Sequence, residues 1–172
     1  MNIPECYDYL SRSRRDLWAC LEGVPDEVLS KPVLPGERFH CIKDLILHIP
    51  MIEDSWLHED IGRDTPVWEG VAALAGAQDG PNYAAFPLDT LLDYWRQVEA
   101  STLGYLDTLT PEEEARLVTV SSSRGDERFT VHGLLWHVMV HEMRHTAQIG
   151  VLLRQAGVKP PFIDLLNYLP TV

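Results

Sequence analysis

Apolar residues recur every three or four positions along four long segments of the chain, the spacing that places them on one face of an α-helix. The four segments are residues 4–22, 42–60, 88–109 and 131–156. In the second segment, steps of three and four alternate, as in the seam of a helix bundle, through Ile42, Leu45, Ile49, Ile52 and Trp56. The pattern therefore predicts four long helices that pack together through these faces.

Turn-forming residues separate the four segments. Gly23 ends the first, and the proline-rich stretch 24–39 predicts a loop with a single helical turn at 26–29. Residues 62–87 predict a long Gly-, Ala- and Pro-rich connection packed over one end of the bundle. Thr110-Pro111 predicts a short turn, and β-branched ends flanking a polar turn in residues 118–131 predict a β-hairpin. The chain is thus expected to be a single all-α domain over residues 1–172, a four-helix bundle with a small β-hairpin before the last long helix.

The amino-acid composition of the chain limits the classes of partner that the protein is expected to bind. The 172 residues carry a net charge of −12, which argues against nucleic acid or an anionic membrane as the main partner, because both require a basic footprint. No segment contains the run of about 20 apolar residues that a membrane span needs. The three cysteines follow no pairing pattern, which is typical of reduced thiols. We therefore expect a cytoplasmic protein.

The last long segment holds the candidate chemistry. Three of the seven histidines, His137, His141 and His145, follow one another at intervals of four. On a helix, His141 and His145 lie on one face a turn apart and can chelate one metal ion. His137 lies a further turn away, which is too far to share that ion with His145. The alternative is a histidine pair that is merely structural.

Residues 141–145, HEMRH, also match the H-E-x-x-H pattern of zinc peptidases. Such enzymes need a third protein ligand, commonly a His or Glu further along the chain. After His145 the sequence has neither, and its one remaining carboxylate is Asp164. A peptidase is therefore disfavoured. His48, on the core-facing seam of the second helix, can instead supply the third imidazole, although a histidine there is usually a buried core residue.

Two stretches carry a family resemblance: LILHI in the second helix and FTVHGLLWHVMVHEMRHTAQIGVLLRQAG in the fourth. With them the whole chain resembles the DinB superfamily, the DinB/YfiT-like metalloenzymes. The resemblance implies an up-down-down-up four-helix bundle in which His48, His141 and His145 bind one divalent metal ion. Ala147-Gln148 stands where the family commonly has Gly-Gln. Imidazole ligands favour nickel or zinc.

The resemblance also implies a class of function. Characterised members include transferases and isomerases that use low-molecular-weight thiols such as bacillithiol or mycothiol on small-molecule substrates. A hydrolase that activates water at the same site stays open, and so does a non-catalytic, stress-related bundle that only binds metal or a ligand. Glu142 lies about 60° from His145 around the helix and is a candidate general base. The remaining histidines, His40, His58, His132 and His137, are interpreted as surface or structural residues.

Assembly is the last expectation. Members of this family frequently form homodimers, and the chain has more tryptophan than one small core is expected to bury: Trp18, Trp56, Trp68, Trp95 and Trp136. A homodimer is therefore expected. The alternative is that the connection 63–87 folds over the bundle and shields these side chains.

Overall fold

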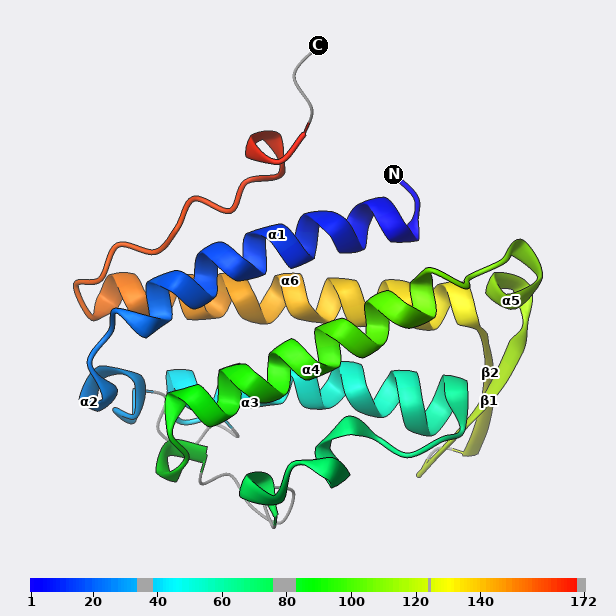
Figure 1. Cartoon of the computed structure of the whole chain (residues 1–172), viewed down its shortest axis with the longest axis horizontal. Coiled ribbons are helices and arrows are strands. Elements are labelled where there is room, and N and C mark those ends of the chain that lie inside the picture. The colour runs from blue at the N-terminus through cyan, green and yellow to red at the C-terminus, as the bar shows by residue number, and fades with distance from the viewer. Residues whose placement is uncertain (34–38, 76–82, 124, 170–172) are drawn as a thin grey trace.

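Four long helices form the body of the protein in the computed structural model, which describes residues 1–33, 39–75, 83–123 and 125–169. They are α1 (Ile3–Glu22), α3 (Ile42–Asp54), α4 (Leu88–Leu106) and α6 (Val131–Gln155). Helices α1 and α6 run in one direction and α3 and α4 in the other (Figure 1). The predicted up-down-down-up bundle is confirmed.

The helices pack as a ring in which α1 contacts α6 and α4, and α3 contacts α4 and α6. Since α3 and α4 are parallel neighbours, the chain must cross the length of the bundle between them. Asp54, at the end of α3, fixes this crossover. Its Oδ1 accepts from the Val67 amide, and its Oδ2 accepts from the Trp68 amide and the Tyr94 hydroxyl.

The second predicted helix needs a correction at its C-terminal end. It is α-helical only to Asp54 and continues as a π-helix, η1 (Ser55–Gly62). Arg63 then adopts a left-handed conformation with φ 58° and ends it. The rest of the described crossover consists of short 3₁₀ turns: η2 (Val67–Gly70), η3 (Ala72–Leu74) and η5 (Tyr83–Ala85). Only one residue of the predicted apolar seam, Trp56, lies in η1, so the sequence pattern could not separate the two helix types there.

The smaller elements agree with the sequence prediction. Helix α2 (Asp26–Leu29) is the single turn expected there, and α5 (Pro111–Ala115) begins after Thr110. Strands β1 (Leu117–Ser122) and β2 (Gly125–Thr130) pair antiparallel, with Leu117 opposite Thr130. The Thr130 hydroxyl accepts from the Gly133 amide and so caps α6. The hairpin therefore leads directly into the helix that carries the HEMRH motif.

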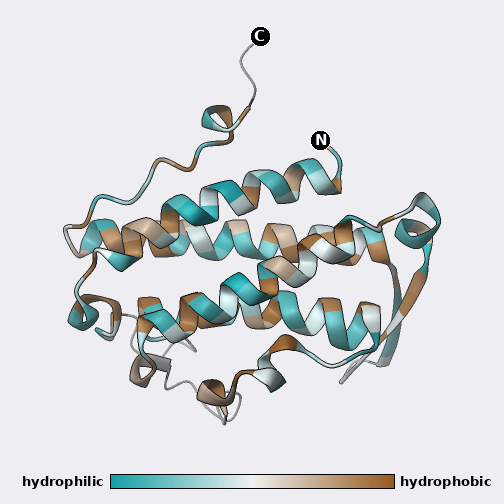
Figure 2. Ribbon diagram, in the orientation of Figure 1, coloured by the Kyte–Doolittle hydropathy of each residue, from teal (hydrophilic) through white to brown (hydrophobic). Residues whose placement is uncertain are grey.

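Hydrophilic and hydrophobic residues alternate along each helix (Figure 2), and most of the buried positions are apolar. Trp18 and Trp95 lie in the core in edge-to-face contact, 5.7 Å between ring centroids. Trp68 packs against that core from the crossover, while Trp56 and Trp136 pack half-buried against its second part. A single chain therefore buries its tryptophan side chains at least in part. Trp68 is among them because the crossover places it against the core.

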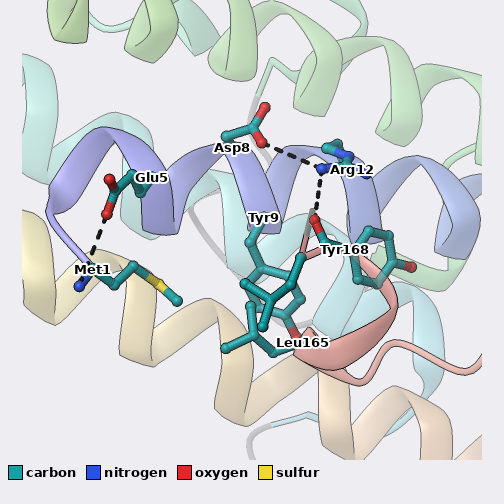
Figure 3. Close-up of a pocket in the computed structure, with 8 residues that line it drawn as sticks. Met1, Glu5, Asp8, Tyr9, Arg12, Leu165 and Tyr168 are labelled. Carbon is teal, nitrogen blue, oxygen red and sulfur yellow. Dashed lines mark hydrogen bonds and ion pairs between the residues drawn. The ribbon is translucent and has the colours of Figure 1, made fainter. Parts of the chain in front are cut away.

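The C-terminal segment, residues 158–169, runs back along α1 (Figure 1). Tyr9 donates its hydroxyl hydrogen bond to the Ile163 carbonyl at 2.7 Å, and Arg12 Nη1 donates to the Tyr168 carbonyl at 2.9 Å (Figure 3). These contacts hold the segment against the surface of α1. Across the described ranges, no helix is both long and apolar enough to cross a bilayer.

A buried ion cluster joins all four helices. Arg14 of α1 is fully buried and donates from Nε and Nη2 to both oxygens of Glu142 of α6, at 2.8 and 2.5 Å. Its Nη1 donates to Glu99 of α4 at 3.0 Å and its Nη2 to Glu53 of α3 at 3.3 Å. Tyr7 and Thr102 also donate to Glu53. The guanidinium of α1 thus contacts a carboxylate from each of the other three long helices.

The substitution Arg14→Met roughly keeps the volume of the side chain but leaves the buried carboxylates of Glu53 and Glu142 without their cation, while Glu99 keeps its ion pair with Arg15. We expect it to lower the free energy of unfolding by about 3–5 kcal/mol, measured by urea denaturation at neutral pH. The matched control is Arg12→Met, because Arg12 is 47% exposed and pairs with Asp8 on the surface. It should cost about 1 kcal/mol or less. Equal losses in the two variants would contradict a central role for the buried cluster.

Candidate metal centre

Three imidazoles converge where α3 packs against α6. His48 Nε2 lies 3.0 Å from His141 Nε2, and the ring centroids of His48 and His145 are 4.9 Å apart. The three candidate ligand nitrogens all lie within 4.8 Å of one another. His48, His141 and His145 are only 9%, 7% and 4% exposed. The structure therefore brings together the three residues that the sequence singled out.

Helix geometry produces this arrangement. His141 and His145 share a face of α6 because they are four residues apart. That face packs against α3, in which every residue from 42 to 50 is buried, so His48 meets the pair from the opposite side. His137, the next histidine in the row, is exposed, and its ring lies 6.2 Å from that of His141 and 5.3 Å from that of Trp56. It is outside the group.

Gln148 fixes the tautomer of His145. Its Oε1 lies 2.6 Å from His145 Nδ1, and since an amide oxygen only accepts, Nδ1 carries the proton. Nε2 then presents a lone pair, the form in which imidazole binds a metal ion. At present that lone pair accepts a hydrogen bond from Arg144 Nη2 at 3.0 Å. Gln148 thus holds His145 in the tautomer that can bind a metal ion through Nε2.

Burial keeps His141 and His145 neutral. It lowers the pKa of His141 to about 3, and the neighbouring charges of His145, His48, Arg144 and His137 lower it further. Burial also lowers the pKa of His145; the hydrogen bond to Gln148 opposes this shift, and Arg144 adds to it. Neutral imidazole is the form that coordinates metal, so these two residues can bind a metal ion at neutral pH without first losing protons.

The donor set fits a divalent ion. Bonds of about 2.0–2.1 Å from three imidazole nitrogens require those nitrogens to be roughly 3.0–3.4 Å apart. The His48–His141 pair already meets this spacing at 3.0 Å, and the wider spacing within the group requires a small contraction. Among the described residues the group contains no fourth His, Cys, Asp or Glu. Three protein ligands with open positions are typical of catalytic rather than structural zinc sites.

Comparison with known proteins identifies the family of the chain. The DinB family profile matches residues 1–171. The chain belongs to the DinB family. No curated protein matches it.

Two solved structures of the same fold share little sequence with this DinB protein. A conserved protein from Enterococcus faecalis is 17% identical, with a TM-score of 0.67 over 90% of this chain and 96% of the other. A DinB-like protein from Bacillus cereus is 19% identical, with a TM-score of 0.57 over 91% of this chain and 95% of the other. At this identity the similarity shows the fold alone.

The carboxylate of Glu142 in the DinB chain contacts Arg14, whereas a general base contacts a substrate or a water molecule. Both of its oxygens accept hydrogen bonds from Arg14, and its side chain is 4% exposed. Burial raises the pKa of Glu142, while Arg14 opposes that rise. These contacts favour a structural role for Glu142 over the general-base hypothesis, which stays a prediction.

The other histidines lie outside the centre. His58 contacts Asp64 and Ser101, His132 contacts Glu114, and His40 is exposed. Two neighbours of the centre were not identified from the sequence. Phe39 stacks over it, with its ring centroid 4.3 Å from that of His48, and Arg144 contacts His145. Arg144 could have been noticed from its place beside a ligand, whereas nothing in the sequence marks Phe39.

Two pockets differ in their relation to the centre. One of 330 Å³ is lined by Ala147, Gln148, Val151, Leu152 and Gln155, and so begins at the residue that holds His145. Another of 460 Å³ lies between α1 and the C-terminal segment, and no histidine lines it (Figure 3). We assign the first to the site despite its smaller volume, because it shares Gln148 with the metal centre.

The lowered pKa of His141 makes a prediction about acid stability. The unfolded chain binds a proton on this residue near its ordinary pKa of 6.5, but the folded protein binds it only near 3. The neutral His141 side chain therefore contributes fully to the free energy of unfolding above pH 6.5, and this contribution is lost as the pH falls toward 3. Without metal, His141→Gln should lose about 3 kcal/mol less stability than the wild type between pH 7 and pH 4.

Urea denaturation in the presence of a chelator measures this difference. The control is His132→Gln, because His132 is exposed and should follow the wild-type profile. Parallel acid profiles for His141→Gln and the wild type would contradict the assignment of a buried neutral imidazole.

Proposed function

We propose that this DinB protein is a metal-dependent enzyme that binds one divalent ion, nickel or zinc, through His48, His141 and His145. The observation that carries the proposal is the convergence of three buried imidazoles with no fourth protein ligand among the described residues. A divalent ion bound there would lower the pKa of a coordinated thiol or water and so provide a nucleophile at neutral pH.

The surrounding residues have distinct roles in this proposal. Gln148 holds His145 with its Nε2 lone pair toward the centre. Phe39 covers the rings of His48 and His145, at 4.3 and 5.8 Å between centroids, and limits the access of water from that side. The pocket beside Gln148 has Val151 and Leu152 in its wall, which suits the apolar part of a small electrophilic substrate.

A thiol-dependent S-transferase and a hydrolase both follow from this arrangement, and family membership favours the transferase. The zinc peptidase reading has less support, because its glutamate is held by Arg14. A non-catalytic, stress-related protein that only binds metal or a ligand is the remaining alternative. It would be favoured if the loaded protein bound neither thiols nor electrophiles.

Metal analysis of protein purified without a polyhistidine tag tests the site. The wild type should hold one divalent ion per chain, and His145→Ala should hold none, because two imidazoles bind far more weakly than three. His137→Ala is the matched control, since His137 lies on the same helix outside the group, and it should retain the ion. Circular dichroism should show equal helix content in all three. Full occupancy in His145→Ala would show that the assigned site is wrong.

We also propose that the protein is cytoplasmic and forms a homodimer. The free thiols of Cys6, Cys20 and Cys41 suit a reducing compartment. Apolar side chains of the C-terminal segment remain uncovered in one chain: Phe162 is 74% exposed, Leu166 75% and Leu169 47%. A second chain would remove them from water.

Light scattering at micromolar concentration should therefore give the mass of two chains. The double substitution Phe162→Asp with Leu166→Asp should give the mass of one, because it places charge in the proposed interface. A wild-type mass of one chain would contradict the dimer.

A further inference from the structure

Arg144 lies beside the metal centre and contacts one of its histidines. It is exposed on α6, next to His145, and its Nη2 lies 3.0 Å from His145 Nε2. No ion pair joins it to a carboxylate of the described residues, in contrast to the buried Arg14 and the exposed Arg12.

The contact with His145 cannot persist once the site is loaded. Nε2 has a single lone pair, and a metal ion needs the same lone pair that the guanidinium now uses. Two cations side by side also repel each other. Metal binding therefore releases the guanidinium, which stays within reach of the open coordination positions because its backbone is adjacent to that of His145.

The loaded centre would also lack compensating negative charge. Its three ligands are neutral imidazoles, and the group contains no carboxylate from the described residues. The buried carboxylates of Glu53 and Glu142 are already occupied by Arg14. A divalent ion at the buried centre and the exposed Arg144 beside it would together create a local excess of positive charge, which favours an anionic ligand.

We propose that Arg144 is a specificity-determining residue that binds a carboxylate of the thiol cosubstrate, so that the site selects thiols carrying a carboxylate over neutral thiols. The planar guanidinium presents paired N–H donors that match the two oxygens of a carboxylate. The inference rests on the proposed function and adds to it the chemical class of the cosubstrate.

Calorimetry on the zinc-loaded protein tests the proposal with two thiols of equal length, 3-mercaptopropionate and 3-mercaptopropan-1-ol. The wild type should bind the acid more tightly than the alcohol. In Arg144→Gln this preference should fall by about tenfold, the value of one charge-assisted paired contact. Arg144→Lys keeps the charge but not the paired donors, so its preference for the acid should lie between those of the wild type and Arg144→Gln.

Arg154→Gln is the matched control, because Arg154 is also exposed on α6 but lies in its last turn. It should keep the wild-type preference. A second readout does not involve thiols: Arg144→Gln should bind zinc more tightly than the wild type, by roughly threefold or more, because the competing hydrogen bond and the repulsion are gone. Competition with a chromophoric chelator measures this affinity.

The outcomes separate the two proposals. If the wild type binds zinc but Arg144→Gln keeps the full preference for the acid, the role of Arg144 is wrong and the metal site stands. If the wild type binds no zinc, the proposed function fails and the role of Arg144 fails with it. An unchanged zinc affinity in Arg144→Gln would show that the guanidinium does not compete for His145.

Discussion

The guanidinium of Arg14 is the interaction on which the arrangement of the four helices depends. It is fully buried and meets one glutamate from each of the other three long helices, Glu53, Glu99 and Glu142. A buried charge is costly unless it is paired, so rotation or sliding of any one helix would leave charges without partners. Such a cluster contributes more to the choice of one packing than to stability in general.

The same cluster sets the orientation of the metal centre. Glu142 directly follows His141 on α6, and because it is held toward α1, the face with His141 and His145 is turned toward α3. Glu53 also accepts a hydrogen bond from Arg14, and it lies one to two turns beyond His48 on α3. Both helices that carry the imidazoles are thus fixed close to the site. Glu142, inside the H-E-x-x-H pattern, accepts hydrogen bonds from Arg14 of α1 and in this way orients the helix that carries His141 and His145.

The two buried polar regions differ in their charged groups. The cluster around Arg14 contains more carboxylate than cation, and hydroxyls of Tyr7 and Thr102 help to satisfy Glu53. The centre around His48, His141 and His145 contains no carboxylate in the described part of the chain. A metal ion bound there would therefore not be neutralised by a protein ligand of that group.

The sequence by itself determined the elements and the ligand candidates. The spacing of apolar residues set the four long helices, and local signals at Thr110 and Thr130 set the short helix and the start of α6. The interval of four between His141 and His145 placed them on one face, because that depends only on helix geometry. The pairing with His48 followed from its place on a core-facing seam and from family resemblance.

Tertiary structure decided what depends on residues far apart in the chain. Glu142 is separated from Arg14 by 128 positions, so no local pattern could show that its carboxylate faces α1 and not the metal centre. The change from α- to π-helix at Ser55 and the position of Phe39 over His48 likewise depend on how the crossover and α3 pack. Local spacing specifies which face a side chain occupies, but only the packing of whole helices specifies what that face meets.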